Sequence, residues 1–237
     1  MKKHDFYLNL VDKKGREVLF QEIKNVKDFI SIKLTMMEIL FSQWNGSKDA
    51  KSCSFPYLHV DDFNLKRAFI VSNNKMISFG IGFTIQAFDA HYIEAFRLKK
   101  TKITAKHISE AQAILGLCDD KTLYKDIDDD DLEQPPSQEA KILFEHLLFE
   151  EPAYIRYDYD KQTKSEVMHP KHHFDVNFSP DFSYKIGLPR KIDESEYIRV
   201  LDKKAFCRKL NLNMVANRFR KGNFQQHNLK KWKKKKK

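Results

Sequence analysis

Residues 67–98 read RAFIVSNNKMISFGIGFTIQAFDAHYIEAFRL, and this stretch decides the fold class. It is rich in β-branched and aromatic residues, which favour strands. Paired asparagines at Asn73-Asn74 mark a turn near its start. We therefore predict an antiparallel meander with strands over residues 67–71, 76–85 and 92–98.

Two glycines, Gly80 and Gly82, lie inside the predicted middle strand. A dinucleotide-binding loop needs a third glycine and a helix directly after it, and neither follows here. Glycine within a strand commonly marks a bulge or a close approach of backbone. We interpret the pair as a bulge or a site of close packing, not as a phosphate-binding loop.

Three segments outside this meander have the pattern of helices. Apolar residues at helical spacing form one stripe that Asn45-Gly46 then ends; they are Ile30, Leu34, Met37, Phe41 and Trp44. Residues 105–117 predict a second helix. Ser137 precedes a third apolar run and is a suitable N-cap. Such stripes normally pack on a core, so we expect these helices to cover a sheet.

The two ends of the chain have weaker patterns. Within residues 6–21, the sequence from Asp12 to Gly15 predicts a turn between two short strands, with a short helix before Gly15 as the alternative. Near the other end we predict strands over 154–159 and 173–178, a return strand that ends at His169-Pro170, and a helix from about 193 to 210.

These elements predict an α+β fold, an antiparallel sheet with packed helices, followed by a basic C-terminal tail. We expect residues 1–210 to form a single domain and residues 211–237 to form a partly disordered tail. An acidic loop at 119–136 interrupts the domain without dividing it into independent halves.

Composition excludes several classes of protein. A hydrophobic share of 41% supports a real core. No apolar run reaches the roughly 18 residues of a membrane helix. The three cysteines lie far apart, which excludes a disulfide framework and a paired-cysteine zinc module. The first residues lack the apolar stretch of a signal peptide, so we expect a cytoplasmic protein.

Charge is distributed unevenly along the chain. The formal net charge is +10, yet residues 203–237 hold 14 of the 43 Lys and Arg and no acid. The remaining 29 basic residues face all 33 acids, so the rest of the chain is mildly acidic. Residues 119–133 carry eight acids against two lysines. Such blocks are commonly solvated; alternatively, the acidic loop competes with a polyanion for the tail.

The tail has the composition of a nucleic-acid-binding arm. Cations neutralise phosphates and release counterions, while aromatic rings stack on bases. A membrane-surface role and a role in solubility or protein docking are the alternatives. The predicted nucleic-acid contacts are Arg218, Arg220, Lys221, Lys230, Lys231, Trp232, Lys233 and Lys234.

Histidines and aspartates cluster between residues 158 and 175. Imidazole and carboxylate groups suit a divalent metal, and His169, His173 and Asp175 are the candidate ligands. Arg156 is suited to hold a phosphate bidentately. A catalytic set would then comprise Arg156, Asp158, His169 and His173. In the alternative interpretation, Arg156 simply pairs with Asp158 and the His169-Pro170 step is a structural turn.

This segment also resembles a bacterial family of domains of unknown function, numbered 2290. The resemblance is carried by YIRYDYD at 154–160 followed by His169-Pro170-x-x-His173, and by Leu188-Pro189-Arg190 before a helix. It extends over most of residues 25–210 and implies a shared fold and a bacterial origin, with accessory roles in mobile or defence loci. The sequence departs from the family pattern at Asp175, where a further histidine would stand.

Three function hypotheses follow. The first is a nucleic-acid-associated accessory protein of a bacterial defence or mobile-element system, which binds through its tail. The second is a metal-dependent nuclease or phosphoesterase that uses the histidine-aspartate cluster. The third is a protein-binding adaptor or antitoxin-like module with a partner encoded nearby.

Overall fold

The computed structural model describes residues 5–10, 12–43, 53–87, 92–119, 135–162, 169–178 and 183–202. The chain divides into one unit at Met1–Leu201 and another at Asp202–Lys237. The boundary predicted at residue 210, most of the acidic loop and the whole tail lie outside the described residues. Among the helices described, none combines the length and apolar character needed to cross a membrane.

Helices and two sheets alternate along the chain. The helices are α1 (Lys13–Leu19), α2 (Val26–Gln43), α3 (Ala105–Leu117), α4 (Gln138–Phe149) and α5 (Glu194–Leu201). The large sheet has the order β1 (Asp5–Asn9), β2 (Tyr57–Asp61), β3 (Arg67–Val71), β4 (Lys75–Gly80), β8 (Ile155–Tyr159), β9 (His172–Val176) and β10 (Tyr184–Gly187). The small sheet contains β5 (Thr84–Ala87), β6 (Ile93–Leu98) and β7 (Thr101–Ile103).

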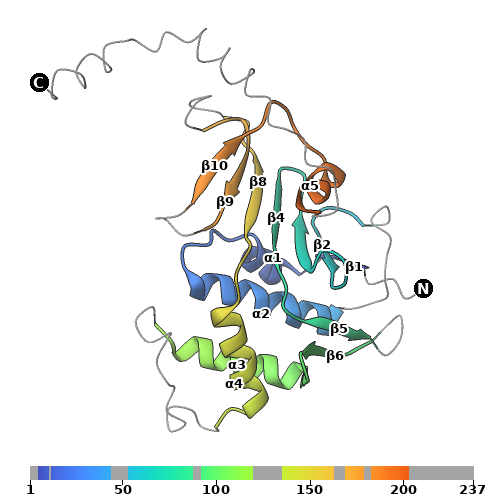
Figure 1. The fold of residues 1–237 in the computed structure, drawn as a ribbon, viewed down its shortest axis with the longest axis vertical. Coiled ribbons are helices and arrows are strands. Elements are labelled where there is room, and N and C mark those ends of the chain that lie inside the picture. The colour runs from blue at the N-terminus through green and yellow to red at the C-terminus, as the bar shows by residue number, and fades with distance from the viewer. Residues whose placement is uncertain are drawn as a thin grey trace, which may run out of the picture. The chain divides into compact units, whose positions relative to one another are not determined.

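Neighbouring strands in both sheets run antiparallel. The predicted α+β class with an antiparallel sheet and packed helices is therefore confirmed. β4 pairs directly with β8, although the residues between them build the small sheet, α3 and α4. Figure 1 shows this excursion below the large sheet. The excursion brings two halves of the chain together at the β4–β8 junction.

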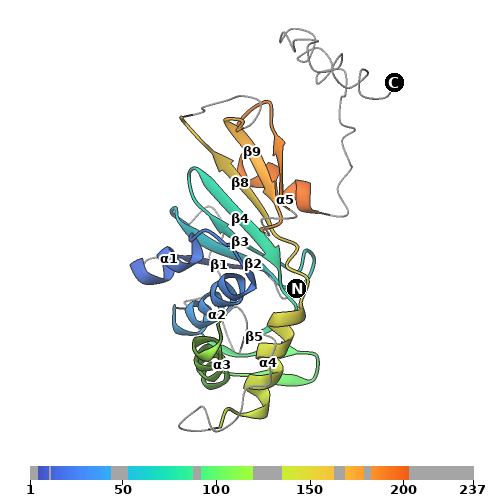
Figure 2. The same ribbon diagram turned by 90° about the vertical axis from the view of Figure 1, so that its left-hand side faces the viewer.

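Helices cover the two faces of the large sheet differently. Figure 2 shows α1 and α2 against one face and α5 against the other. The first face packs into the main core, which continues into the small sheet and α3. The second face forms a smaller aromatic cluster in which Tyr157 and Phe174 meet the fully buried Tyr197 of α5.

The helix predictions are confirmed by burial and capping. Ile30, Leu34 and Met37 are completely buried along α2. α3 spans the predicted residues. α4 begins where expected, because the Ser137 side chain accepts a hydrogen bond from the backbone N–H of Ala140. Apolar periodicity together with an N-cap was sufficient to place these elements.

The predicted turn between Asp12 and Gly15 is wrong. Asp12 is the N-cap of α1, and its carboxylate accepts the backbone N–H of Gly15. Gly15 is buried inside the first turn, and a Cβ there would lie 2.8 Å from Cδ1 of Ile39. The glycine therefore allows α1 to pack closely on α2 instead of forming a hairpin.

The single strand predicted over 76–85 is also wrong. β4 ends at Gly80, and β5 begins at Thr84 in the other sheet. A Cβ on Gly82 would lie 2.2 Å from Nε2 of His146 on α4. The prediction that these glycines mark close packing is confirmed at Gly82, and this packing accompanies the change of sheet.

The remaining strands match the predictions in part. β6 and β8 lie within the predicted ranges, and β9 begins one residue early, at His172. The sequence pattern did not predict β2, β7 or β10. Of the predicted return strand, only the residues around His169 are described. The C-terminal helix is described as far as Leu201.

Candidate functional site

A cluster of charged side chains lies at the β8–β9–β10 end of the large sheet. Arg156 and Asp158 of β8 stand opposite Asp175 and His173 of β9, respectively, and Asp175 stands opposite Lys185 of β10. Side chains alternate along a strand, so these five residues face away from the aromatic cluster under α5. They belong to the face that α1 and α2 cover further along the sheet (Figure 2).

Arg156 joins the two carboxylates. Its Nε donates to Oδ2 of Asp158 at 2.7 Å, and its Nη2 donates to Asp175. The second oxygen of Asp175 accepts from Lys185. The prediction that Arg156 pairs with Asp158 on one strand face is confirmed. Each carboxylate of the cluster therefore contacts at least one cationic side chain, and Asp175 contacts two.

His173 lies beneath these ion pairs and is only 1% exposed. Its Nδ1 lies 2.8 Å from the carbonyl oxygen of Pro170, which can only accept a hydrogen bond, so Nδ1 carries the proton. Nε2 then presents its lone pair to the cluster and accepts from Lys185 at 3.3 Å. This nitrogen is 3.9 Å from Oδ2 of Asp158 and 3.8 Å from Oδ2 of Asp175.

Neighbouring charges control ionisation in the cluster. Burial works against ionisation of Asp175, but the hydrogen bond from Lys185 and the charge of Arg156 outweigh it and lower the pKa of this carboxyl. Burial likewise opposes the charge of Arg156, yet Asp158, Tyr154 and Asp175 raise the pKa of its guanidinium. Both groups stay charged at neutral pH.

The cluster opens into a cavity of about 420 Å³. Arg156, Asp175 and Lys185 line it together with Tyr154, whose pKa burial raises to about 12. Glu22 also lines the cavity, whereas Asp158 and His173 are not among its lining residues. A ligand in the cavity would therefore meet two cations, Arg156 and Lys185, and two carboxylates, Asp175 and Glu22.

The geometry also fits a divalent cation. Asp158, His173 and Asp175 each offer one ligand atom, and these atoms lie within 4.8 Å of one another. Two carboxylates and one imidazole are a suitable donor set for Mg²⁺, Mn²⁺ or Zn²⁺. Arg156 and Lys185 contact the same carboxylates, so a bound cation would require these two side chains to turn toward an anion.

His169 does not join this ligand set. Its Nε2 lies 3.4 Å from Oδ2 of Asp160, and its ring centroid is 4.8 Å from that of His173. The structure thus brings together Arg156, Asp158, His173 and Asp175 from the predicted site. His169 lies beside them, outside the group of three close ligand atoms, and its assignment as a metal ligand stays a prediction.

Lys185 and Lys75 are the members that sequence reasoning missed. Lys75 of β4 stands opposite Asp158, and burial lowers the pKa of its amine. Lys185 lies on a strand whose residues are all exposed, so no hydrophobic alternation marks it. The pairing of β10 with β9 brings Lys185 into the cluster, and pairing of this kind is not visible in one sequence.

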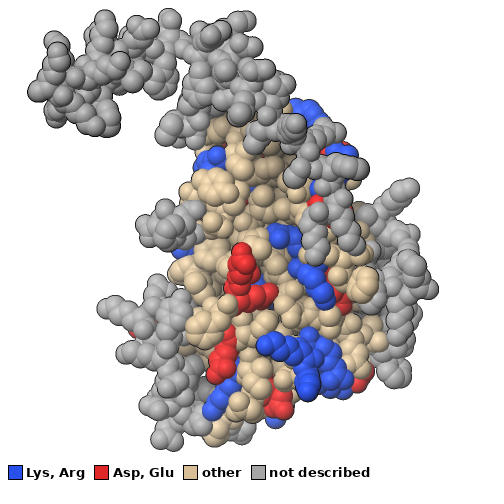
Figure 3. All heavy atoms as spheres, in the orientation of Figure 1, with Lys and Arg blue, Asp and Glu red and all other residues tan. Residues whose placement is uncertain are grey.

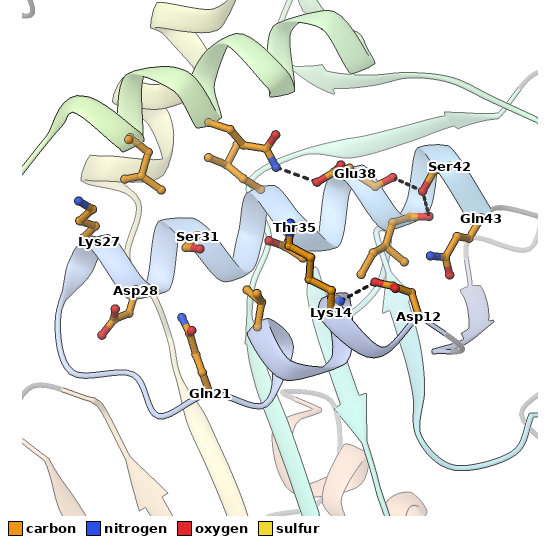
Figure 4. Close-up of a pocket in the computed structure, with 17 residues that line it drawn as sticks. Asp12, Lys14, Gln21, Lys27, Asp28, Ser31, Thr35, Glu38, Ser42 and Gln43 are labelled. Atoms are coloured by element: carbon orange, nitrogen blue, oxygen red, sulfur yellow. Dashed lines mark hydrogen bonds between the residues drawn. The ribbon is translucent and has the colours of Figure 1, made fainter.

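A larger hollow than this cavity lies elsewhere in the described part of the molecule. It has a volume of about 630 Å³ and runs between α1, α2 and α3. Figure 4 shows that its labelled lining residues mix amides and hydroxyls with both signs of charge. The groups with metal-ligand geometry among the described residues lie at β8 and β9 instead. We therefore place the candidate chemistry in the smaller cavity.

Other predicted contacts cannot be placed. All eight predicted nucleic-acid contacts of the tail, from Arg218 to Lys234, lie outside the described residues. The same holds for most of the acidic loop.

Comparison with known proteins gives no further assignment. No family model matches the chain, and neither a curated protein nor a solved structure matches it significantly. The resemblance to the family numbered 2290 therefore stays a hypothesis. Any functional conclusion depends on the geometry of the site.

Proposed function

We propose that this chain is a divalent-metal-dependent phosphoesterase that cleaves nucleic acid at the cavity beside β8, β9 and β10. One observation carries the proposal. Asp158, His173 and Asp175 place three metal-ligand atoms within 4.8 Å of one another, next to Arg156 and Lys185. Carboxylates and imidazole for the metal, with guanidinium and ammonium for a phosphate, are the groups that phosphodiester hydrolysis requires.

Some of these side chains would bind the cation and the others would bind the substrate. A divalent cation held by Asp158, His173 and Asp175 would supply Lewis acidity. Arg156 would donate two parallel hydrogen bonds to the phosphate, and Lys185 would add a point charge. Water adds to phosphorus, the ester P–O bond breaks, and the proton of the water ends on the leaving alcohol.

The ion pairs of Arg156 and Lys185 with the two carboxylates must break before a cation and a phosphate can bind. Without a ligand, Arg156 and Lys185 neutralise the two carboxylates. A cation takes over that neutralisation, and a phosphate accepts the two side chains in exchange. The contacts to the cation and to the phosphate replace the broken ion pairs, which offsets part of the cost of desolvating these charges in a partly buried cavity.

The experiment uses the full chain with Mn²⁺ as probe. Calorimetry measures metal binding, and gel analysis measures cleavage of an end-labelled single-stranded oligonucleotide with Mn²⁺ or with EDTA. We expect cleavage that EDTA abolishes. Asp175→Asn should reduce both metal affinity and cleavage by at least about tenfold. Glu145→Gln removes an exposed carboxylate from α4 and should match the wild type.

Two results would overturn the proposal. One is a wild-type protein that neither binds Mn²⁺ nor cleaves the oligonucleotide. The other is an Asp175→Asn variant whose only change is a lower free energy of unfolding. In that case Asp158, His173 and Asp175 serve a structural ion-pair network.

A further inference from the structure

A second cationic hollow lies at the small sheet, away from the β8–β10 cluster. It has a volume of about 360 Å³ and is lined by Lys66, Arg97 and Lys99 around the segment 81–84. None of its lining residues is an aspartate or a glutamate. Figure 3 shows Lys and Arg side chains gathered on this part of the surface, over β5 and β6.

Arg97 is held in place by a chain of polar contacts. Its Nε donates to Oε1 of Gln86 at 2.7 Å. The amide of Gln86 in turn donates to Glu94, which also accepts from Lys102. These contacts fix the guanidinium through Nε, and its two terminal nitrogens form no hydrogen bond with the residues that the structure describes. Lys102 and Arg97 both help to lower the pKa of the Glu94 carboxyl, so Glu94 also holds Arg97 in place by charge attraction.

The two lysines of the hollow, Lys66 and Lys99, are exposed. Neither makes an ion pair with any residue that the structure describes, although the Glu150 carboxylate lies close to Gly82 in the wall of the same hollow. Both have left-handed backbone, with φ of 55° and 52°. At Lys99 this conformation belongs to the two-residue turn that joins β6 to β7, and it fixes the backbone from which the side chain extends.

The acids nearest to the hollow are engaged elsewhere. Asp62 is 2% exposed and accepts the backbone N–H of Ile85 at 2.6 Å. Glu150 pairs with the buried Lys33. The lining itself holds three cations and no carboxylate, so an anion in the hollow would interact favourably with all three.

We propose that Lys66, Arg97 and Lys99 form a phosphate-binding site for the backbone of a nucleic acid. A guanidinium with free terminal nitrogens matches the paired oxygens of a phosphate, and ammonium groups on both sides suit the neighbouring phosphates of a strand. The site deepens the proposed function, on which the choice of a nucleic acid rests, by giving the substrate a contact remote from the cleavage site.

Binding is measured under conditions that prevent cleavage. A failure of this inference can then be distinguished from a failure of the proposed function. Full-length Asp175→Asn protein in EDTA is titrated against a fluorescein-labelled single-stranded 20-mer at several salt concentrations. The test variant adds Lys66→Gln, Arg97→Gln and Lys99→Gln. The control adds Lys13→Gln, Lys24→Gln and Lys106→Gln, which removes the same charge from exposed positions.

We expect the test variant to lose at least about tenfold in affinity, and the salt slope to fall by about 0.7 for each lost phosphate contact on a single strand. The control should change much less. A single Arg97→Lys variant keeps the charge but loses the paired donors, and should show an intermediate loss. Circular dichroism checks that each variant is folded.

Three outcomes would overturn the inference. Equal losses in test and control variants would show that only net charge matters. Competition by poly-glutamate as effective as that by unlabelled oligonucleotide would assign the hollow to acidic peptides. Pyrophosphate that binds the hollow without displacement by the oligonucleotide would assign it to a small phosphate ligand.

Discussion

Lys33 is a fully buried cation in the main core. It extends from α2 to pair with Glu150 at the end of α4, and its ammonium lies 4.7 Å from the ring centroid of Phe29. Burial lowers the pKa of Lys33, although Glu150 acts in the opposite direction. The pair therefore ties two helices together at the cost of desolvating both charges.

Removing only Lys33 should be strongly destabilising. Lys33→Met leaves the Glu150 carboxylate largely buried without its partner, and the free energy of unfolding should fall by about 3 kcal/mol. The double variant Lys33→Met/Glu150→Gln removes both charges and should recover most of that loss. Urea unfolding of the two single variants and the double variant measures the coupling. Additive effects would show that the two charges act independently.

The ionisation of Asp175 should make stability depend on pH. A carboxyl whose folded pKa lies below the ordinary value of 3.8 stabilises the fold above that value. This contribution is lost as pH falls through the folded pKa. Chemical unfolding of the wild type and of Asp175→Asn should therefore differ most near neutral pH, and the difference should shrink below about pH 4. A difference that stays constant across this range would contradict the assigned ion pairs.

At the scale of elements, apolar periodicity predicted α2, α3 and α4, whereas the start of α1 was predicted as a turn. α2 and α4 each have an apolar stripe, and α4 also has a polar cap. The strands were harder to predict. All residues of β2 are buried, whereas all residues of β10 are exposed, so neither shows the alternation that identifies a strand.

The α2 stripe provides a direct test of core packing. Met37 is completely buried in the centre of that helix. Met37→Ala should lower the free energy of unfolding by about 2–5 kcal/mol through lost contacts and a residual cavity. Glu38→Ala changes the adjacent, exposed position and should cost much less. Equal effects in urea unfolding would contradict the close packing of this face.

Gly82 and Gly116 form a matched pair of glycines. A Cβ on Gly82 would meet His146 of α4, whereas a Cβ on Gly116 in α3 has no atom within 4 Å. Gly82→Ala should cost about 1–3 kcal/mol because the His146 side chain and the neighbouring Glu150 carboxylate must move. Gly116→Ala should be neutral or stabilise by up to about 1 kcal/mol, since alanine favours helix. Thermal unfolding compares the stability of the two variants. A larger loss of stability for Gly116→Ala than for Gly82→Ala would contradict the close packing of the segment before β5 against α4.

At the scale of the whole molecule, the candidate site depends on pairings that one sequence does not reveal. The histidine-aspartate cluster was predicted because its residues lie close together along the chain. Lys75 joins it only because β4 pairs with β8 across the intervening small sheet and two helices. The cationic hollow at Arg97 was not predicted, because its lining residues come from three separate segments of the chain.

The distribution of charge leads to a prediction for the whole chain. Residues 211–237 carry ten of the Lys and Arg residues and no acid, while every described helix and strand ends at or before Leu201. Deleting this tail should therefore leave the free energy of unfolding of Met1–Leu201 nearly unchanged. Affinity for an oligonucleotide should fall by at least about tenfold, because counterion release scales with the number of phosphates neutralised.

The same truncation distinguishes the contribution of the tail to nucleic-acid binding from that of the hollow lined by Lys66, Arg97 and Lys99. If both contact one strand, the truncated protein should still bind weakly, and the triple substitution should abolish the remaining binding. The salt slope should then fall in two steps, one for each deletion of charge. Fluorescence anisotropy across a salt titration measures both. A truncated protein that binds as tightly as the full chain would show that the tail makes no phosphate contact, and its lysines would then serve solubility or protein docking.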